Sequence, residues 1–204
     1  NPYVQLTMHM MMAFGIKFYA NKEYMLTSGQ YTNAQVEIES DYSNAAFFIV
    51  MAVLNKDIKL KGLKFKSLQG DRAILSYLEK MGVVFNYQDF SIIKNNIHGI
   101  ELDLSLTPDL VPVIAAIATV ARGRSVLTGL DKLVLKESNR IVSTYESLKA
   151  LGADIEISAN KLIINGKDKL AGGVTISSYN DHRIIMALCA ISSKVLNPYT
   201  ITNA

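Results

Sequence analysis

The order of apolar and polar positions along the chain predicts short strands alternating with helices. Apolar residues recur at helical spacing before Gly15, Gly82 and Gly152, and glycine is a common residue just past the last turn of a helix. Two short apolar runs separated by a turn follow each glycine, which predicts a β-hairpin. The expected hairpin strands are 16–19 with 24–26, 83–87 with 90–94, and 154–157 with 161–164.

A second pattern consists of a strand, a turn that bears an aspartate, and an apolar helix. The aspartates are Asp41, Asp109 and Asp181, which are 68 and 72 residues apart, and the helix-ending glycines are 67 and 70 residues apart. The helices expected at 45–54, 111–121 and 184–192 are apolar nearly all round, so they should be buried against one another. The flanking strands are expected at 36–39, 100–104 and 174–177 before these helices, and at 58–63, 125–130 and 199–204 after them.

These patterns define a repeated β-α-β-α-β-β unit of about 70 residues in an α/β fold. We expect full units at 34–95 and 96–166, and part of another at 167–204. Residues 1–30 are expected to be the helix-and-hairpin tail of a preceding domain, and 31–204 an incomplete domain, with the crossover near 28–34. The chain is therefore interpreted as a piece of a longer protein.

Composition narrows the function classes without changing this fold. Half of the 204 residues are hydrophobic, 19% are charged and the net charge is +3, which fits a globular protein. The basic residues are dispersed and no apolar run is long enough to cross a bilayer, so neither nucleic acid nor a membrane is an expected partner, whereas small anions are.

The single cysteine, Cys189, lies in an apolar run and is expected to be a buried structural thiol. A chain without an internal disulfide fits a reducing, cytoplasmic compartment. The sequence shows neither a metal-ligand spacing nor a glycine-rich nucleotide loop, so we expect no metal and no cofactor.

Candidate functional residues are found where equivalent loops of two units differ in sequence. Residues 136–140 read Lys-Glu-Ser-Asn-Arg, and the equivalent residues 68–72 read Leu-Gln-Gly-Asp-Arg. The fold needs a polar helix start in both loops, but it does not need the ionised Lys136-Glu137 pair. The alternative is a solvated helix start with Ser138 as its N-cap.

The third aspartate is followed by a histidine and an arginine that the other two units lack. His182 and Arg183 follow Asp181 directly. If equivalent turns gather at one end of a closed domain, these residues meet Asp109 and the 136–140 loop around helix N-termini. Such a group would bind a multiply anionic ligand and move protons. The alternative for Asp109 and Asp181 is that they only cap their helices.

Several segments resemble the 5-enolpyruvylshikimate-3-phosphate (EPSP) synthases. They are residues 41–48, 108–112, 135–140 and 180–187, with support from 67–71. The resemblance implies an inside-out α/β barrel of the enolpyruvyl transferase type, in which each of two domains holds three β-α-β-α-β-β units. This chain then corresponds to most of the C-terminal domain, and the missing N-terminal domain of the same parent chain is its partner.

The resemblance also implies a reaction and a set of roles. The family transfers the enolpyruvyl group of phosphoenolpyruvate to the 5-hydroxyl of shikimate-3-phosphate through a tetrahedral intermediate and releases phosphate. Asp109 would engage the 5-hydroxyl as base or orienter, and Glu137 would handle the proton at the enolpyruvyl methylene. The implied substrate-binding residues are Tyr3 and Lys136 on the shikimate-3-phosphate side, and Arg140 and Arg183, supported by Asp181 and His182, on the phosphoenolpyruvate side.

The chain also departs from the family pattern. Asn139 stands where the family usually has Asp, which removes a negative charge beside Arg140, and Val134 stands where it usually has Arg. The family's N-terminal Lys, Ser and Arg residues and a later Lys are not in this sequence, so the fragment alone is expected to be inactive. Two alternatives are a UDP-N-acetylglucosamine enolpyruvyl transferase-like enzyme and a non-catalytic binding module of the same fold.

Overall fold

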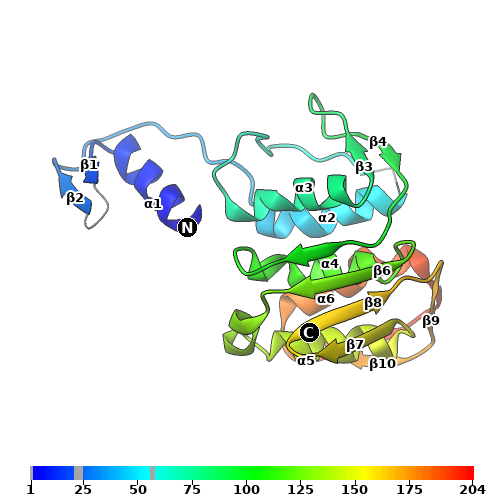
Figure 1. Cartoon of the computed structure of the whole chain (residues 1–204). Helices are drawn as coiled ribbons and strands as arrows, with labels where there is room; N and C mark the ends of the chain where they lie inside the picture. Colours follow the sequence, from blue (N-terminus) through cyan, green and yellow to red (C-terminus); the bar gives the residue numbers. More distant parts are fainter. Residues whose placement is uncertain (1, 21–24, 56–57) are drawn as a thin grey trace.

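The computed structural model describes residues 2–20, 25–55 and 58–204. Residues 1 and 21–24 of the expected tail, the last of which begins the strand expected at 24–26, and residues 56–57 of the unit expected at 34–95 lie outside this range. Helix α1 (Pro2–Ala13) is followed by the antiparallel strands β1 (Lys17–Ala20) and β2 (Met25–Ser28). Helix α1 has no buried residue, and residues 30–41 lead from this segment to the main body without regular structure (Figure 1).

Three apolar helices form the centre of the main body. They are α2 (Tyr42–Asn55), α4 (Val111–Ala118) and α6 (His182–Ala190), and each contacts the other two. All eight residues of α4 are buried, which confirms the expectation from its uniformly apolar sequence. Each large aliphatic side chain buried here contributes roughly 1.5–3 kcal/mol of transfer free energy, so the helices can pack without polar partners.

Two amphipathic helices cover this centre. Helix α3 (Ala73–Lys80) follows the 3₁₀ turn η1 (Gly70–Arg72), and α5 (Arg140–Ala150) follows the turn η3 (Asp131–Leu135). The glycines expected to end helices α1, α3 and α5 adopt φ angles of +94°, +95° and +96°, a region where only glycine is unstrained. Among the helices in the described ranges, none combines the length and the apolar character that crossing a membrane requires.

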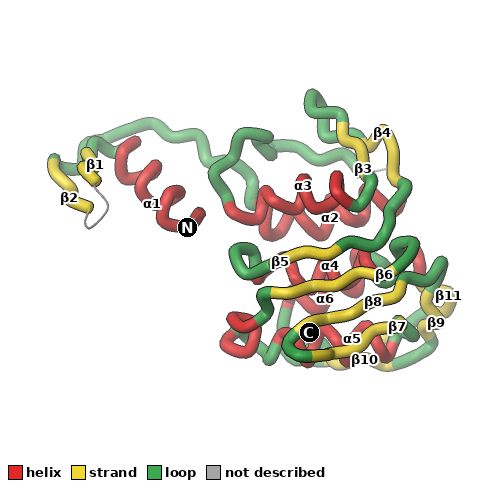
Figure 2. Tube along the Cα trace, in the orientation of Figure 1, coloured by secondary structure: helices red, strands yellow, loops and turns green. Residues whose placement is uncertain are grey.

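Most of the expected strands are present. Strands β3 (Val83–Phe85) and β4 (Ile92–Asn95) form one hairpin, and β7 (Asp154–Ser158) and β8 (Lys161–Asn165) form another. Strand β5 (Glu101–Asp103) lies parallel to β6 (Arg124–Thr128) in a four-stranded sheet of order β5-β6-β8-β7, which Figure 2 shows beside the helices. The parallel pairs of the last unit are β10 (Thr175–Ser177) with β12 (Thr200–Thr202) and β9 (Leu170–Gly172) with β11 (Val195–Asn197). Two further 3₁₀ turns are η2 (Pro108–Leu110) and η4 (Ser192–Lys194).

The expected strands at 36–39 and 58–63 do not form, so that part of the prediction is wrong. The two segments still meet, because Ser40 N donates to Gly62 O at 3.0 Å and Glu37 pairs with Lys64 at 3.1 Å. The β5–β6 pair gains β8 as a third strand, whereas hairpin β3–β4 forms a separate two-stranded sheet. An isolated pair of strands is only marginally stable, and Ile38 is 87% exposed. Neither a third strand nor burial of side chains therefore favours β-pairing between residues 36–39 and 58–63.

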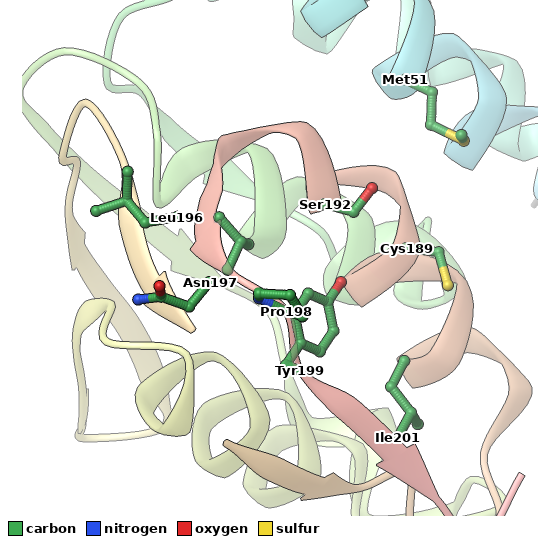
Figure 3. A pocket seen from close by; sticks show the side chains of 9 residues that line it. Met51, Cys189, Ser192, Leu196, Asn197, Pro198, Tyr199 and Ile201 are labelled. Atoms are coloured by element: carbon green, nitrogen blue, oxygen red, sulfur yellow. The ribbon is translucent and has the colours of Figure 1, made fainter. Parts of the chain in front are cut away.

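The expectation that Cys189 is buried is also wrong. Its side chain is exposed and faces a groove of about 580 Å³ next to α6, with Met51 of α2 on the other wall (Figure 3). The groove is lined by Met51, Cys189, Ser192, Val195, Leu196, Asn197, Pro198, Tyr199 and Ile201. None of these side chains is ionised at neutral pH, since partial burial raises the pKa of the Cys189 thiol, so the groove lacks the charges that the candidate chemistry requires.

Candidate active site

Arg140 lies at the centre of the residues that the sequence singles out. As the first residue of α5 it has a fully buried side chain, and its guanidinium group contacts three carboxylates that come from different segments. Nη1 donates to Asp109 at 2.8 Å, Nε donates to Asp181 at 2.9 Å, and Nη2 donates to Glu137 and to Asp181. This burial rules out the alternative of a solvated helix start.

Asp109 connects the carboxylates to the other cationic side chains. It belongs to η2, and it accepts contacts from Lys136 Nζ at 3.0 Å and from Arg183 Nη2 at 3.5 Å as well as from Arg140. Burial acts to raise the pKa of Asp109, but the hydrogen bond from Lys136 and the charges of Arg183, Lys136 and Arg140 outweigh it and hold this pKa below its ordinary value. Asp109 forms no cap for the helix that follows, so the cap-only alternative is wrong for this residue.

Asp181 combines a cap with an ion pair. Its side chain accepts from Arg183 N at 3.0 Å at the start of α6, and the same carboxylate holds Arg140. The pKa of Asp181 is lowered because the hydrogen bond and charge of Arg140 outweigh burial, which acts to raise it. Ser138 donates to Asp181 at 3.0 Å and does not cap α5, since that position belongs to Asn139, which accepts from Val142 N at 3.5 Å.

The charge of Arg140 is fully balanced even though Asn139 replaces the aspartate that is usual in the family. The asparagine side chain caps α5, while Asp109, Glu137 and Asp181 already surround the guanidinium group. A further negative charge at position 139 is therefore not needed to hold Arg140 in place.

The two remaining predicted residues lie at the edge of this group. Tyr3 of α1 is 46% exposed, and burial together with the charges of Asp71 and Asp109 raises the pKa of its hydroxyl against the opposing effect of Arg183. The N-terminal end of α1 is close to η1, because a Cβ atom at Gly70 would lie 3.1 Å from Pro2 Cβ. His182 is exposed, and its side chain makes no hydrogen bond or ion pair with the described residues.

The structure thus joins six predicted residues into one cluster at three helix starts. We call Asp109, Lys136, Glu137, Arg140, Asp181 and Arg183 the Arg140 cluster. Its three carboxylates match its three cations, so the cluster is close to electrically neutral before a ligand arrives. The cluster as a whole therefore offers an anion little net attraction, and a contact must come from a cation nitrogen that no carboxylate occupies.

Sequence reasoning missed one neighbour of the cluster. Asp71 is 2% exposed, and it influences the electrostatics of both Tyr3 and Asp109. Its position is equivalent to Asn139 in the repeat, which is the signal that could have drawn attention to it. An acidic residue in that position is ordinary for a cap, so only its burial marks it as unusual.

The lowered pKa values of Asp109 and Asp181 predict acid sensitivity. The stability that these groups contribute is present above the ordinary aspartate pKa, about 3.9, and is lost as the pH falls through their lower folded values. We expect Asp181→Asn to cost about 3 kcal/mol at pH 7, because it weakens a buried ion pair, and to cost much less near pH 3. Urea unfolding at several pH values measures both numbers.

The exposed Asp168 supplies the matched control for this experiment. Asp168→Asn should change the unfolding free energy little at either pH. A gap between wild type and Asp181→Asn that stays constant from pH 7 to pH 3 would contradict the proposed electrostatic origin.

The arrangement of helices, hairpins and parallel pairs matches the enolpyruvyl transferase fold. An EPSP synthase structure from Acinetobacter baumannii superposes with a TM-score of 0.82 at 28% identity, covering 97% of this chain and 49% of that one. The enolpyruvyl transferase NikO from Streptomyces tendae superposes with a TM-score of 0.71 at 17% identity, which bears on the fold alone.

Sequence comparison narrows the class to one family. The profile of the family described as EPSP synthase (3-phosphoshikimate 1-carboxyvinyltransferase) matches residues 1–204. The 3-phosphoshikimate 1-carboxyvinyltransferase of Clostridium kluyveri is 39% identical over 207 aligned positions, which cover 99% of this chain and 48% of the relative. The chain belongs to the EPSP synthase family, as its motifs indicated, and it spans about half the length of the relatives it matches.

Proposed function

We propose that this chain forms the C-terminal half of the active site of an EPSP synthase. The complete protein would transfer the enolpyruvyl group of phosphoenolpyruvate to the 5-hydroxyl of shikimate-3-phosphate and release phosphate. The observation that carries the proposal is the Arg140 cluster, in which residues from three separate segments of a chain of this family meet at helix starts. A structural ion pair with Arg140 alone would not require the further contacts of Asp109 with Lys136 and Arg183.

The domain organisation of the complete protein is part of this proposal. Residues 1–30 would be the tail of the preceding domain, and residues 31–204 an incomplete second domain made of the units 34–95, 96–166 and 167–204. The rest of the parent chain would supply the opposite wall of the substrate site. Tyr3 supports this division, because it lies on α1 and yet is within electrostatic reach of Asp109 and Arg183.

Asp109 is suited to act on the 5-hydroxyl of shikimate-3-phosphate. Its lowered pKa keeps the carboxylate ionised at neutral pH, and its side chain is 18% exposed, so it stays accessible. An ionised carboxylate next to Lys136 can accept the hydroxyl hydrogen bond and orient the oxygen for attack on C2 of phosphoenolpyruvate. Lys136 then neutralises charge on the shikimate side.

Glu137 is suited to carry the proton at the enolpyruvyl methylene. Addition forms the bond between the 5-oxygen and C2, passes the hydroxyl proton to Asp109 and places a proton from Glu137 on C3. Elimination returns the proton from C3 to Glu137, restores the double bond and breaks the bond from C2 to the phosphate oxygen, and the released phosphate takes the proton held by Asp109. Glu137 is half-exposed and is held by Arg140, so one carboxyl group can give the proton and take it back.

The two arginines differ in what they can offer to an anion. Every nitrogen of the Arg140 guanidinium group donates to a carboxylate, whereas Arg183 Nη1 is buried and has no partner among the described residues. We therefore assign the direct contact with the anionic end of phosphoenolpyruvate to Arg183. Arg140 holds the carboxylates in place, Asp181 orients it, and contacts of Arg140 and His182 with the ligand stay predictions.

The acceptor substrate that the full-length protein uses distinguishes the proposed function from its alternatives. The full-length protein should release phosphate from phosphoenolpyruvate when shikimate-3-phosphate is supplied, and it should not do so with UDP-N-acetylglucosamine. Turnover of the nucleotide sugar alone would favour the related transferase. Absence of turnover with both acceptors would favour a non-catalytic module.

The 204-residue chain alone is expected to show no turnover and to bind shikimate-3-phosphate only weakly, with a Kd of about 1 mM or above. The physical reason is the balanced charge of the Arg140 cluster, which offers a dianionic ligand little net attraction without the other half of the site. Isothermal titration calorimetry with shikimate-3-phosphate and with phosphoenolpyruvate measures this. Micromolar binding of either ligand would contradict the division of the site between two domains.

A further inference from the structure

Asp71 is a buried acidic group that the proposed reaction does not use. It lies in η1, where one carboxylate oxygen accepts from Ser43 Oγ at 2.6 Å. The other oxygen, Oδ1, is shielded from solvent and has no hydrogen-bond partner among the described residues. A buried carboxylate with an unpaired oxygen is costly when it is ionised, but a protonated carboxylic acid is much less so.

Burial and the nearby carboxylates disfavour a negative charge on Asp71. The groups that face it come from five other segments and are Asp41 before α2, Ser43 on α2, Asp109 on η2, Arg183 on α6 and, on α1, Tyr3. Burial raises the pKa of Asp71, the charges of Asp109 and Asp41 raise it further, and Ser43 and Arg183 only partly oppose this. Asp71 thus differs from Asp109 and Asp181, whose pKa values are lowered by close cations.

Arg183 is the one cation that Asp71 and Asp109 share. Its Nη2 lies 3.5 Å from Asp109, while its Nη1 is buried without a partner, as is Asp71 Oδ1. An ionised Asp71 would attract Arg183, whose charge acts to lower the pKa of Asp71. An uncharged Asp71 exerts far less pull, so Arg183 stays with Asp109.

We propose that Asp71 works as an uncharged carboxylic acid and is a positioning residue for Arg183. In this form it leaves the guanidinium group beside Asp109 and Nη1 unpaired, so that the partly exposed Arg183 side chain can turn this nitrogen to the anionic end of phosphoenolpyruvate. Ionisation of Asp71 releases one proton and draws Arg183 towards Oδ1, which weakens anion binding as the pH rises. The identity of the anion rests on the proposed function, whereas the charge state of Asp71 does not.

Carbon-13 NMR of the 204-residue chain tests the charge state directly. With ¹³C-labelled aspartate, the Cγ resonance of Asp71 is assigned by its loss in Asp71→Asn. We expect it to keep the chemical shift of a protonated acid well above the ordinary aspartate pKa of about 3.9. Titration of Asp71 at or below that ordinary value would overturn the proposal.

Adding phosphoenolpyruvate at tens of millimolar to the same sample tests the coupling to an anion. A bound anion near Arg183 should move the titration of Asp71 to still higher pH, because a second negative charge disfavours ionisation. A shift to lower pH at saturating ligand would overturn the proposed coupling. Inorganic phosphate as a second probe shows whether any anion produces the effect.

Variants of the full-length protein separate positioning from a purely structural role. Asparagine copies the shape and neutrality of the protonated acid, so Asp71→Asn should lower kcat/KM for phosphoenolpyruvate by less than about threefold, and Asp71→Ala by about tenfold or more, mainly through KM. Asp71→Asn should also lose the part of the alkaline decline in kcat/KM that Asp71 causes. Equal damage by both variants, or an unchanged pH profile in Asp71→Asn, would overturn the proposal.

The free energy of unfolding provides a test of the charge state of Asp71 that does not depend on the activity of the complete protein. A raised pKa contributes stability at low pH that is lost as the pH rises through the folded value, so Asp71→Asn should gain stability relative to wild type as the pH rises. Urea unfolding of the 204-residue chain measures this, and a constant difference across the pH range would contradict an uncharged Asp71. Failure of the turnover assay with intact NMR and unfolding results would count against the proposed function alone.

Discussion

Replacing Glu137 by glutamine in the full-length protein is expected to lower turnover by about 10²- to 10⁴-fold while ligand binding changes little. Glutamine keeps the size of the side chain and can still accept a hydrogen bond from Arg140, so the cluster should hold its shape. It cannot give or take a proton at C3, and both chemical steps of the proposed reaction require that transfer. Steady-state rates of phosphate release, together with titration of shikimate-3-phosphate, measure the two effects separately.

The exposed Glu156 on β7 offers a matched control, because it carries the same charge without contacts to the cluster. Glu156→Gln should leave turnover within about twofold of wild type. Full activity in Glu137→Gln would remove the proton-transfer role from Glu137. Loss of both turnover and ligand binding would instead make Glu137 a binding or structural residue.

The repeated unit was predictable because its signals are local. Apolar residues around the whole circumference of α4 can only be buried, and each glycine at a helix end reports a backbone angle at that residue. Neither inference needs knowledge of what lies elsewhere in the chain. The order of helices and hairpins in residues 96–166 follows from such signals, and the structure confirms it.

The errors concern features that depend on distant neighbours. An alternating pattern at 36–39 predicts a strand, but a ladder forms only where other strands complete the sheet, as β6 and β8 do for β5. Cys189 lies in an apolar helix, yet its own face of α6 is turned to a groove. A run of residues gives the period of burial, but the packing of the neighbouring elements decides which faces are covered.

In the candidate site, too, local sequence features were predictable and contacts between distant residues were not. The composition of the 136–140 loop and the comparison with 68–72 identified the unusual residues. That Arg140 is completely buried could not be predicted, because its partners Asp109 and Asp181 are 31 and 41 positions away. Asp71 was missed for the same reason, since only the three-dimensional arrangement gives it a buried oxygen without a partner.

Arg140 is expected to matter for folding as well as for the site. Arg140→Ala leaves Asp109, Glu137 and Asp181 close together without their shared cation, and two of them are largely or fully shielded from water. Breaking a buried ion pair in this way costs about 3–5 kcal/mol, which corresponds to a fall in Tm of roughly 10 °C for a chain of this size. Arg140→Lys should recover only part of the lost stability, because the lysine ammonium group lacks the planar, forked guanidinium with which Arg140 reaches three carboxylates.

The repeat provides the control that tests this explanation. Arg72 is equivalent to Arg140, but it is exposed and donates to Phe65 O at 2.9 Å, so Arg72→Ala should cost less than about 1 kcal/mol. The deficit of Arg140→Ala should shrink as the pH falls from 7 towards 3, because carboxylates left without their cation take up protons, which removes the repulsion, while the wild type loses its ion pairs only as the pH falls through the lowered pKa values of Asp109 and Asp181. Thermal and urea unfolding of both variants at pH 7 and pH 3 provide the four values needed. If Arg140→Ala and Arg72→Ala lower the free energy of unfolding equally at pH 7, the cluster does not stabilise the fold. Its charges would then serve ligand binding alone.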